Sequence, residues 1–455
     1  MNGRLPSRFR TFGALVLVGA CACTGLSCGH AEPSAELRDA VRDYSSALPV
    51  FPGAEGFGTN TRAGRGGQVI CVTSLDASGP GSLREAILTA GPRTIVFDVG
   101  GVIDLADVLV IAEPYVTIAG QTAPNPGITI LGAGILVHTH DVLIQHLRVR
   151  VGDRENGPDP GGRDGISVVG RPDGTAPIYN VVVDHCSVSW AIDEGVSTWH
   201  PGVHDVTFRQ CIIAENLSRS IHPEHEHSKG LLIGDHSKRI AVIGNFFAHN
   251  RRRNPFVKGD VSALIVNNFI YNPGSATIHF GDLERSGPSL GTVIGNAMVA
   301  GADTSLFNTM IAILIDARWS GCVAGMDNLA TGARFRRHVF APWIWRDLDA
   351  YADAPVRVTP LTIRSGAEVR AWVLEHAGAR PAQRDEADLR IVDSARNRTG
   401  CIINSPRDVG GWPHAEPQTI ALDWPEDPAA DTDGDGYTDV EERLHELAAQ
   451  VEGLS

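Results

Sequence analysis

The hydrophobic pattern along the chain consists of short β-branched runs separated by Gly, Asn, Asp and Pro. Long amphipathic helical periods are missing between these runs, so the pattern predicts β-strands rather than helices. The runs lie between residues 94 and 299 and read TIVFDV, YVTIAG, GITILG, DVLIQHLRVRV, NVVVDHCSV, DVTFRQCII, RIAVIGNFF, SALIVNNFI and GTVIGNAMV.

Several of these runs share a pattern that repeats at unequal intervals. Aligning VDHC, FRQC, VIGN, IVNN and VIGN places one residue of each in an equivalent position, with spacings of 25, 34, 23 and 28: Cys186, Cys211, Asn245, Asn268 and Asn296. A spacing in the low twenties, lengthened by inserted loops, indicates one coil of a parallel β-helix per repeat. Stacked asparagines would then form a hydrogen-bonded ladder. A β-sandwich is the alternative, but its hairpins would show more two-residue turns and a clearer polar and apolar alternation.

A few segments predict helices at the ends of this all-β region. Ser82 stands three residues before Glu85 in GSLREAI, which predicts a short capping helix ahead of the strands. A second helix is predicted around 366–377, within VTPLTIRSGAEVRAWVLEHAGARP. We expect the segment RDEADLRIVDSARNRTG, which follows it, to pack back on the solenoid.

The N-terminus has the layout of a secretory signal peptide. Arg4, Arg8 and Arg10 precede the short apolar run TFGALVLVGACA, which is too short to span a bilayer stably. The residues before Cys21 resemble a lipoprotein cleavage site, which would leave Cys21 as a lipid anchor. Plain cleavage nearby is the alternative. We therefore expect a secreted or periplasmic protein, or an outer-membrane lipoprotein.

The pattern divides the chain into four parts. We predict a signal peptide or lipoprotein leader at 1–28, a linker at 29–48, a parallel β-helix domain at 49–425, and a tail at 426–455. No apolar run outside the leader is long enough for a membrane span.

Composition and charge limit the kinds of partner. The 455 residues are 43% hydrophobic and 20% charged, which is ordinary globular composition. The formal net charge of −14 argues against nucleic-acid binding, so a polyanion would need a local basic patch. The stretch HNRRRNPFVKG, at 249–259, is such a patch. Five of the eight cysteines lie beyond the leader, and none has CxxC spacing, so we predict no disulfide framework and no zinc site.

Several motifs, in this order, resemble those of pectate lyases of polysaccharide lyase family 1, in a divergent branch found among bacterial secreted proteins. They are FPGAEGFG, SLDASGPGSLREAI, VDHCSVSWAIDEGVS, HSKGLLIG and RRNPFVKG, and the resemblance covers roughly residues 50–300. It implies a right-handed parallel β-helix, a pectin lyase-like solenoid. It also implies Ca²⁺-dependent cleavage of α-1,4-linked polygalacturonate (pectate), or a related uronan, by β-elimination.

The same resemblance implies calcium ligands. Asp164, in RDGISVV, matches a family calcium aspartate, and Asp193, in IDEGVS, matches the next one about one coil later. The family often has another acid four residues further on, where this chain has Ser197. Glu194, Asp184, water or substrate would then have to complete the coordination of Ca²⁺.

The basic patch matches the family's catalytic motif of arginine, any residue and proline, followed three residues later by another basic residue. Arg253 is thereby implied to be the base that takes the C5 proton, and Lys258 and Lys229 are implied to bind substrate. An arginine base is demanding, because the pKa of arginine exceeds 12. Repulsion from Arg251, Arg252 and Lys229 would supply part of the required depression.

The histidines of the chain are not predicted to be catalytic. His222, His225 and His227, in HPEHEHSKG, lack the HExxH pattern, and Pro223 excludes a shared helical face. His185, next to an aspartate in VVVDHC, is expected to be a buried structural residue.

The tail contains the spacing of an EF-hand loop in DTDGDGYTDVEE, at 431–442. The predicted Ca²⁺ ligands are Asp431, Asp433, Asp435, Tyr437 through its carbonyl, Asp439 and Glu442. ERLHELAAQV provides the exiting helix, but the proline-broken DWPEDPAAD provides no entering one. We predict an isolated structural calcium loop, with an acidic disordered tail as the alternative.

Two other functions remain open from the sequence. A glycoside hydrolase could use paired carboxylates among Asp164, Asp184, Asp193 and Glu194. A non-catalytic adhesin or carbohydrate-binding solenoid would account for Ser197 and Lys258 in place of the family's usual residues. We expect a monomer that binds an anionic polysaccharide and no nucleic acid.

Overall fold

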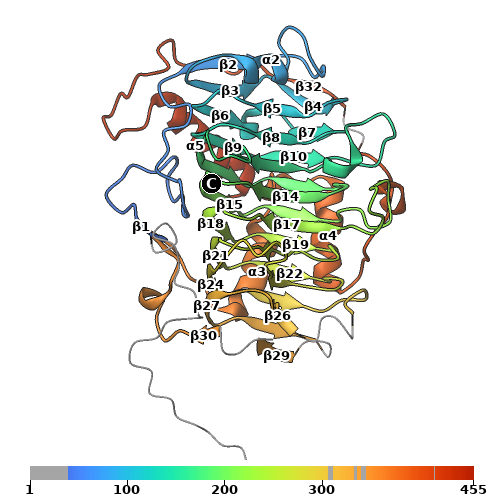
Figure 1. The fold of residues 1–455 in the computed structure, drawn as a ribbon. Coiled ribbons are helices and arrows are strands. Elements are labelled where there is room, and N and C mark those ends of the chain that lie inside the picture. Colours follow the sequence, from blue (N-terminus) through green and yellow to red (C-terminus); the bar gives the residue numbers. More distant parts are fainter. Residues whose placement is uncertain (1–38, 306–310, 333–335, 340–344, 414–415, 455) are drawn as a thin grey trace, which may run out of the picture.

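The fold is taken from a computed structural model, and its core is a stack of β-strand coils (Figure 1). The structure describes residues 39–305, 311–332, 336–339, 345–413 and 416–454. The predicted leader, with Cys21, lies outside the described residues.

Each coil contributes a strand to each of three long sheets, in which neighbouring strands pair in parallel apart from one terminal pair. Sheet 1 contains β2 (Gln68–Val72), β3 (Arg93–Phe97), β6 (Val116–Ala119), β9 (Val142–Gln145), β12 (Ile178–Asp184), β15 (Val203–Arg209), β18 (Lys238–Ile243), β21 (Ser262–Val266), β24 (Ser289–Ile294), β27 (Gly321–Met326) and β30 (Trp345–Asp347).

Sheets 2 and 3 form the other two faces. Sheet 2 contains β4 (Val99–Asp104), β7 (Ile128–Leu131), β10 (Leu147–Arg150), β13 (Ser187–Ser189), β16 (Ile212–Ala214), β19 (Phe246–Ala248), β22 (Phe269–Tyr271), β25 (Ala297–Val299), β28 (Leu329–Thr331) and the antiparallel β32 (Gln418–Thr419). Sheet 3 contains β5 (Leu109–Ile111), β8 (Ile135–Val137), β11 (Ile166–Val169), β14 (Glu194–Trp199), β17 (Lys229–Ile233), β20 (Phe256–Val257), β23 (Ile278–Phe280), β26 (Ile311–Ile315) and β29 (Arg336–Val339).

The predicted parallel β-helix is confirmed, and several of the predicted strands are pairs of strands. DVLIQHLRVRV, for example, forms β9 and β10 with His146 between them. His146 has a φ of 57°, and the equivalent His185 and Gln210 in the next two coils have φ of 46° and 48°. One left-handed residue turns the chain from sheet 1 to sheet 2, and this turn is short enough to keep the sequence pattern continuous.

The predicted asparagine ladder is present in this turn. The side-chain amide of Asn245 donates to Oδ1 of Asn268 (3.0 Å), and the next two links, Asn268 to Asn296 and Asn296 to Asn328, are both 2.9 Å. Each oxygen also accepts the backbone N–H at the turn of the preceding coil, as Asn245 does from Cys211 (2.9 Å). The ladder thus satisfies buried backbone groups that no strand pairing reaches.

The interior of the coils is a continuous stack of Val, Ile, Leu and Phe side chains. Within sheet 1, for example, Val142, Val181, Val206 and Ile240 occupy the same register in four successive coils, and all four are fully buried. In-register parallel strands place like side chains above one another, which explains why the β-branched runs recur in the sequence.

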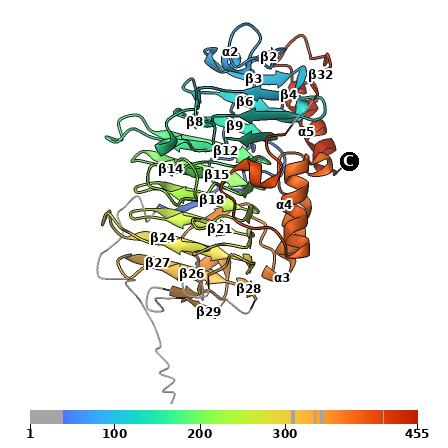
Figure 2. The ribbon, with the colours of Figure 1, turned by 90° about the vertical axis from the view of Figure 1, so that its right-hand side faces the viewer.

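Helices cap the stack and cover one side of it (Figure 2). The predicted α2 (Leu83–Leu88) is confirmed, with the Ser82 side chain accepting the Glu85 backbone N–H. The predicted α3 (Gly366–His376) is also present, and the following segment packs back as expected, as helix α4 (Glu386–Asn397). Apolar residues of α3 and α4 pack on sheet 2.

The last helix returns to the early coils. α5 (Asp439–Glu452) contacts the 3₁₀ turns η1 (Gly120–Thr122) and η4 (Pro381–Gln383). Other short elements are η2 (Pro160–Gly162), η3 (Tyr351–Asp353), η5 (Pro406–Val409), and β1 (Val41–Asp43), which pairs in parallel with β31 (Arg357–Thr359). No helix among the described residues is long and apolar enough to cross a membrane.

Candidate active site

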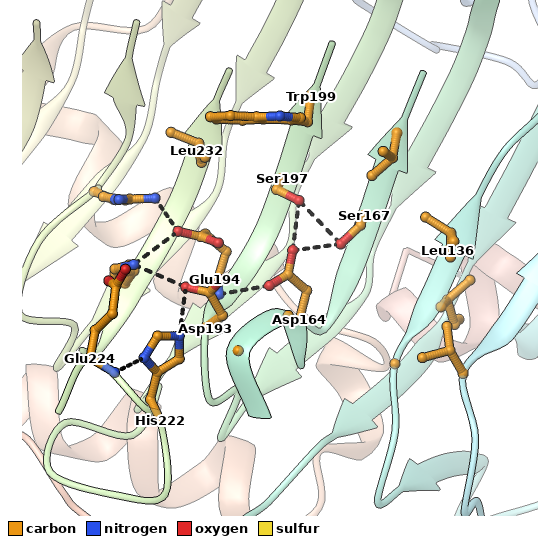
Figure 3. Close-up of a pocket in the computed structure, with 18 residues that line it drawn as sticks. Leu136, Asp164, Ser167, Asp193, Glu194, Ser197, Trp199, His222, Glu224 and Leu232 are labelled. Carbon is orange, nitrogen blue, oxygen red and sulfur yellow. Dashed lines mark hydrogen bonds and ion pairs between the residues drawn. The ribbon is translucent and has the colours of Figure 1, made fainter. Parts of the chain in front are cut away.

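A pocket of about 500 Å³ opens on sheet 3, and acidic and basic residues line one side of it (Figure 3). Its acidic and basic residues are Asp164, Asp193, Glu194, Glu224, Lys229 and Arg253, and its apolar side includes Leu136, Val169, Trp199 and Leu232.

The register of sheet 3 brings these charges together. Ile166 pairs with Val196, so Asp164 and Glu194 stand opposite each other in adjacent coils. Glu194 pairs in turn with Lys229, and Lys229 forms a parallel bridge with Arg252 in the next coil. Residues that are more than twenty positions apart in sequence therefore line up as one row, because the strands stack in register.

Asp164 is held by hydrogen bonds from its own and the next coil. Its carboxylate accepts from the hydroxyls of Ser167 (2.7 Å) and Ser197 (2.8 Å), and from the backbone N–H of Glu194 (2.9 Å). Ser197, which takes the place of an acid in the family pattern, thus fixes the orientation of Asp164.

Asp193 is surrounded by bases. Nζ of Lys229 donates to its Oδ1 at 2.9 Å, and Nε2 of His227 lies 3.1 Å from the same oxygen. His222 stacks on His227 with ring centroids 3.3 Å apart. Sequence reasoning missed these histidine contacts, because the loop before β17 carries both rings to Asp193 from a position more than twenty residues away.

Arg253 and Glu194 form the third group. The guanidinium of Arg253 donates to Oε1 of Glu194, and Nζ of Lys229 lies 3.5 Å from the same oxygen. Arg253 also lies over the ring of Phe256, 5.6 Å from its centroid. The structure therefore places the predicted Arg253, Lys229, Asp164 and Asp193 in one pocket.

Three of the four carboxylates of the pocket lie close together, and their pKa values diverge. Burial and the nearby charge of Asp164 raise the pKa of Glu194 to about 8, despite the opposing effect of Arg253. Burial and the charge of Asp193 likewise raise the pKa of Asp164. Burial opposes the ionisation of Asp193 as well, but hydrogen bonds from His227 and Lys229 hold its pKa below the usual range.

Lys258 and Asp184 lie elsewhere. Nζ of Lys258 contacts Asp235 (2.6 Å) and Glu284 (2.9 Å), and it lies 4.3 Å from the ring centroid of Trp199. Lys258 therefore touches a residue of the pocket wall rather than the acidic row. Asp184 is at the end of β12 in sheet 1, and it cannot complete a cation site formed by Asp164 and Asp193.

The tail loop has part of the predicted arrangement. Carboxylate oxygens of Asp431, Asp433 and Asp435 lie within 4.8 Å of one another. The buried Tyr437 lies under Arg65, and α5 begins at the predicted ligand Asp439. The described residues just before the loop form turns and no helix, as the sequence predicted.

Comparison with known proteins identifies relatives over most of the chain. The chain is 32% identical over 413 residues to a probable pectate lyase C of Aspergillus flavus, covering 87% of both chains. It is 34% identical over 408 residues to a probable pectate lyase C of Emericella nidulans, covering 87% of this chain and 86% of the relative. No family model matches the chain. The relatives named here are fungal, so placement in a bacterial branch stays a prediction.

Solved structures support the fold. A Bacillus subtilis pectate lyase variant superposes with a TM-score of 0.51 at 13% identity, covering 73% of this chain and 98% of the other. The thermostable pectate lyase PL 47 gives the same TM-score, identity and coverage. The fold, the motifs and the identity over most of the length agree. The chain therefore belongs to the pectate lyase family of polysaccharide lyases.

Proposed function

We propose that the sheet 3 pocket cleaves α-1,4-linked polygalacturonate, or a related uronan, by Ca²⁺-dependent β-elimination with Arg253 as the base. The observation that carries this proposal is the gathering of Asp164, Glu194, Lys229 and Arg253 in a single pocket. Glycoside hydrolysis needs paired carboxylates, one of them an acid, but it does not need the two bases beside them.

The acidic side of the pocket suits Ca²⁺. Candidate oxygens of Asp164, Asp193 and Glu194 lie within 4.8 Å of one another, and Ca²⁺ takes six to eight oxygen ligands. The pKa values of Asp164 and Glu194 are raised first by burial and then by the charge of a neighbouring carboxylate, and a cation would relieve this second effect. Bound there, Ca²⁺ would neutralise a uronate carboxylate and so acidify the C5 hydrogen.

The basic side would hold and deprotonate the sugar. Lys229, already beside Asp193 and Glu194, would bind a uronate carboxylate through its ammonium group. Arg253 would take the C5 proton on a nitrogen of its neutral guanidine form, after it has lost a proton to solvent and no longer pairs with Glu194. Because free arginine titrates above pH 12, the reactive fraction should grow as the pH rises. The predicted contact of Lys258 with substrate stays a prediction.

Absorbance tests the reaction directly. The purified full chain, with Ca²⁺ and polygalacturonate, should produce the conjugated C4=C5 product, whose absorbance grows with time. Chelation should stop the growth, and added Ca²⁺ should restore it. New reducing ends without absorbance would indicate a hydrolase, and binding without any product would indicate a non-catalytic solenoid.

The tail loop is proposed as a separate structural Ca²⁺ site, and the protein as an exported monomer. Asp433→Ala in the full chain should remove one calcium from titration calorimetry and leave turnover unchanged. If turnover falls in parallel with calcium binding, the loop is not independent of the pocket.

A further inference from the structure

A second group of metal-binding side chains lies away from the pocket, where α5 meets sheet 1. Nitrogen and oxygen atoms of His146, Asp184, His185 and Glu452 lie within 4.8 Å of one another. The two histidines occupy the left-handed turn position of successive coils, and their rings stack 5.3 Å apart. Glu452 is the last residue of α5.

Two ring nitrogens in this group make no well-aligned hydrogen bond, although each lies close to a carboxylate oxygen. His146 lies with Nδ1 2.7 Å from the carbonyl oxygen of Ala379, so Nδ1 carries the proton and the neutral ring has its lone pair on Nε2. That Nε2 and the Nδ1 of His185 are buried, and their nearest acceptors are carboxylate oxygens of Glu452 and Asp184, at 3.3 and 3.1 Å. The two histidines are only 0% and 3% exposed, and buried polar atoms of this kind usually have a partner.

The spacing of the four atoms fits a tetrahedral ion. His146 Nε2 lies 3.3 Å from Glu452 Oε1, and His185 Nδ1 lies 3.6 Å from the same oxygen and 3.1 Å from Asp184 Oδ2. Zinc ligands at about 2.0–2.1 Å in tetrahedral geometry are about 3.3–3.4 Å apart. These three separations are close to those between ligands of one ion, and the two nearly parallel rings, 12° apart, have to turn toward each other to share it.

We propose that His146, Asp184, His185 and Glu452 bind one divalent transition-metal ion of the Zn²⁺ type. Imidazole nitrogens favour such an ion over Ca²⁺, which takes oxygen ligands in larger number. Two neutral imidazoles and two carboxylates also balance its charge. The sequence predicted no zinc site because that prediction considered cysteine spacing, and here the ligands come from segments far apart in the chain.

Neighbouring groups orient the ligands. The carbonyl of Ala379 fixes the tautomer of His146, as the outer partners of metal-bound histidines do. Arg209 and Gln145 donate to Asp184 at 2.7 and 2.9 Å. The amide nitrogen of Gln210 lies 3.0 Å from Nε2 of His185. Metal binding through Nδ1 puts the proton on Nε2, so this amide has to turn its oxygen toward the ring.

Four protein ligands leave no open position, so the site is structural rather than catalytic. It joins the end of α5 to two coils of the solenoid. A cavity of about 560 Å³, lined by His185 and Glu452, gives the ion a path from solvent. The metal should therefore raise the stability of the docked helix without entering the chemistry of the sheet 3 pocket.

Metal analysis of the full chain tests this proposal. The protein is stripped with a transition-metal chelator in excess Ca²⁺, which keeps calcium sites filled, and is then titrated with Zn²⁺. We expect one tightly bound Zn²⁺ per chain and a higher Tm. Glu452→Gln should lose that ion and the Tm gain. Gln210→Glu, which offers a fixed acceptor to His185, should keep it. His376→Gln, in the same cavity but outside the group, is the matched control.

A second measurement on the unaltered chain guards against variants that fail to fold. Co²⁺ in the stripped protein should give the intense visible bands of a tetrahedral ion, and Zn²⁺ should displace them. Absence of a stoichiometric ion, Co²⁺ bands typical of octahedral coordination, or Zn²⁺ binding unchanged in Glu452→Gln would each overturn the proposal. None of these readouts depends on pectate cleavage.

Discussion

Two clusters of charged side chains in this molecule differ in their balance. Where α4 packs on sheet 2, Arg148 and Arg150 face Asp385 and Asp388, with an Arg150–Asp388 distance of 2.6 Å. Although burial opposes it, the charges of Asp388 and Asp385 raise the pKa of Arg150 above its usual range. Each charge there has a partner.

The pocket on sheet 3 has no such balance. Three carboxylates face Lys229 and Arg253, and two of the three have raised pKa values. Burial alone therefore does not mark a functional site. An excess of one sign of charge, fixed by the register of the strands, indicates a binding site for a ligand of the opposite charge.

The largest expected effect is on catalysis. Arg253→Ala should lower kcat by roughly 10²–10⁴-fold, as expected when a proton-transfer group is lost. Initial rates of absorbance growth on polygalacturonate across the alkaline range measure it, with circular dichroism as a check on folding. Wild-type turnover in this variant at high pH would rule out Arg253 as the base.

A substitution in the balanced cluster of Arg148, Arg150, Asp385 and Asp388 should lower stability rather than activity. Arg150→Met removes the closer cationic partner of the buried Asp388 and leaves only Arg148, at 3.7 Å, and this should lower the free energy of unfolding by about 3–5 kcal/mol. Urea unfolding measures the loss, while turnover per folded molecule should be unchanged. Arg396→Met is the control, because Arg396 is half exposed and should cost less than about 1 kcal/mol.

The contribution of the sheet 3 carboxylates to stability should change with pH in the opposite direction to that of an ion-paired acid. Without Ca²⁺, the pKa of Glu194 is about 8 in the folded chain, against an ordinary 4.5. The folded state then keeps a proton that the unfolded state has lost. The free energy of unfolding should therefore fall as the pH rises from 4.5 through about 8.

Urea unfolding in chelator measures this fall, and Glu194→Gln should flatten it. The same variant should also bind Ca²⁺ more weakly. An equal pH dependence in the variant and the wild type would mean that Glu194 is not the group that titrates.

The smallest effect is a difference in KM between variants of Lys229 and of Lys258. Lys229→Met should raise KM about tenfold or more, because it removes a charged contact in the pocket. Lys258→Met should change KM less than about threefold, since Asp235 and Glu284 already neutralise Lys258. An equal rise in KM for both variants would support the direct substrate contact implied for Lys258.

The sequence predicted the fold through features that repeat locally. The aligned asparagines predicted both the coil and the ladder, because each coil has to satisfy the same turn N–H. The capping box at Ser82 predicted α2 for a similarly local reason. The segment of α4 was predicted to pack on the solenoid, but its helix was not predicted. Asp385 at the N-cap and the spacing of Ala387, Ile391 and Ala395 were signals of that helix.

The contacts between distant segments could not be predicted in this way. Arg150 meets Asp388 across 238 residues, and nothing near either residue signals the other. Whether Asp193 or Glu194 stands opposite Asp164 depends on the register of the strands. A shift of one residue in that register would exchange the two acids. The loop that carries His222 and His227 reaches Asp193 only in the folded chain, and no local sequence pattern indicates this contact.

The return of α4 and α5 to the early coils has a consequence for the order of assembly. The coils stack on immediate neighbours and can form progressively as the chain emerges. Arg150, by contrast, cannot form its ion pair until Asp388 has been synthesised. The 238 residues between them take roughly 10–50 seconds to synthesise. The outer helices should be the last elements to dock and the first to detach. Limited proteolysis should therefore release the C-terminal segment while the solenoid stays intact.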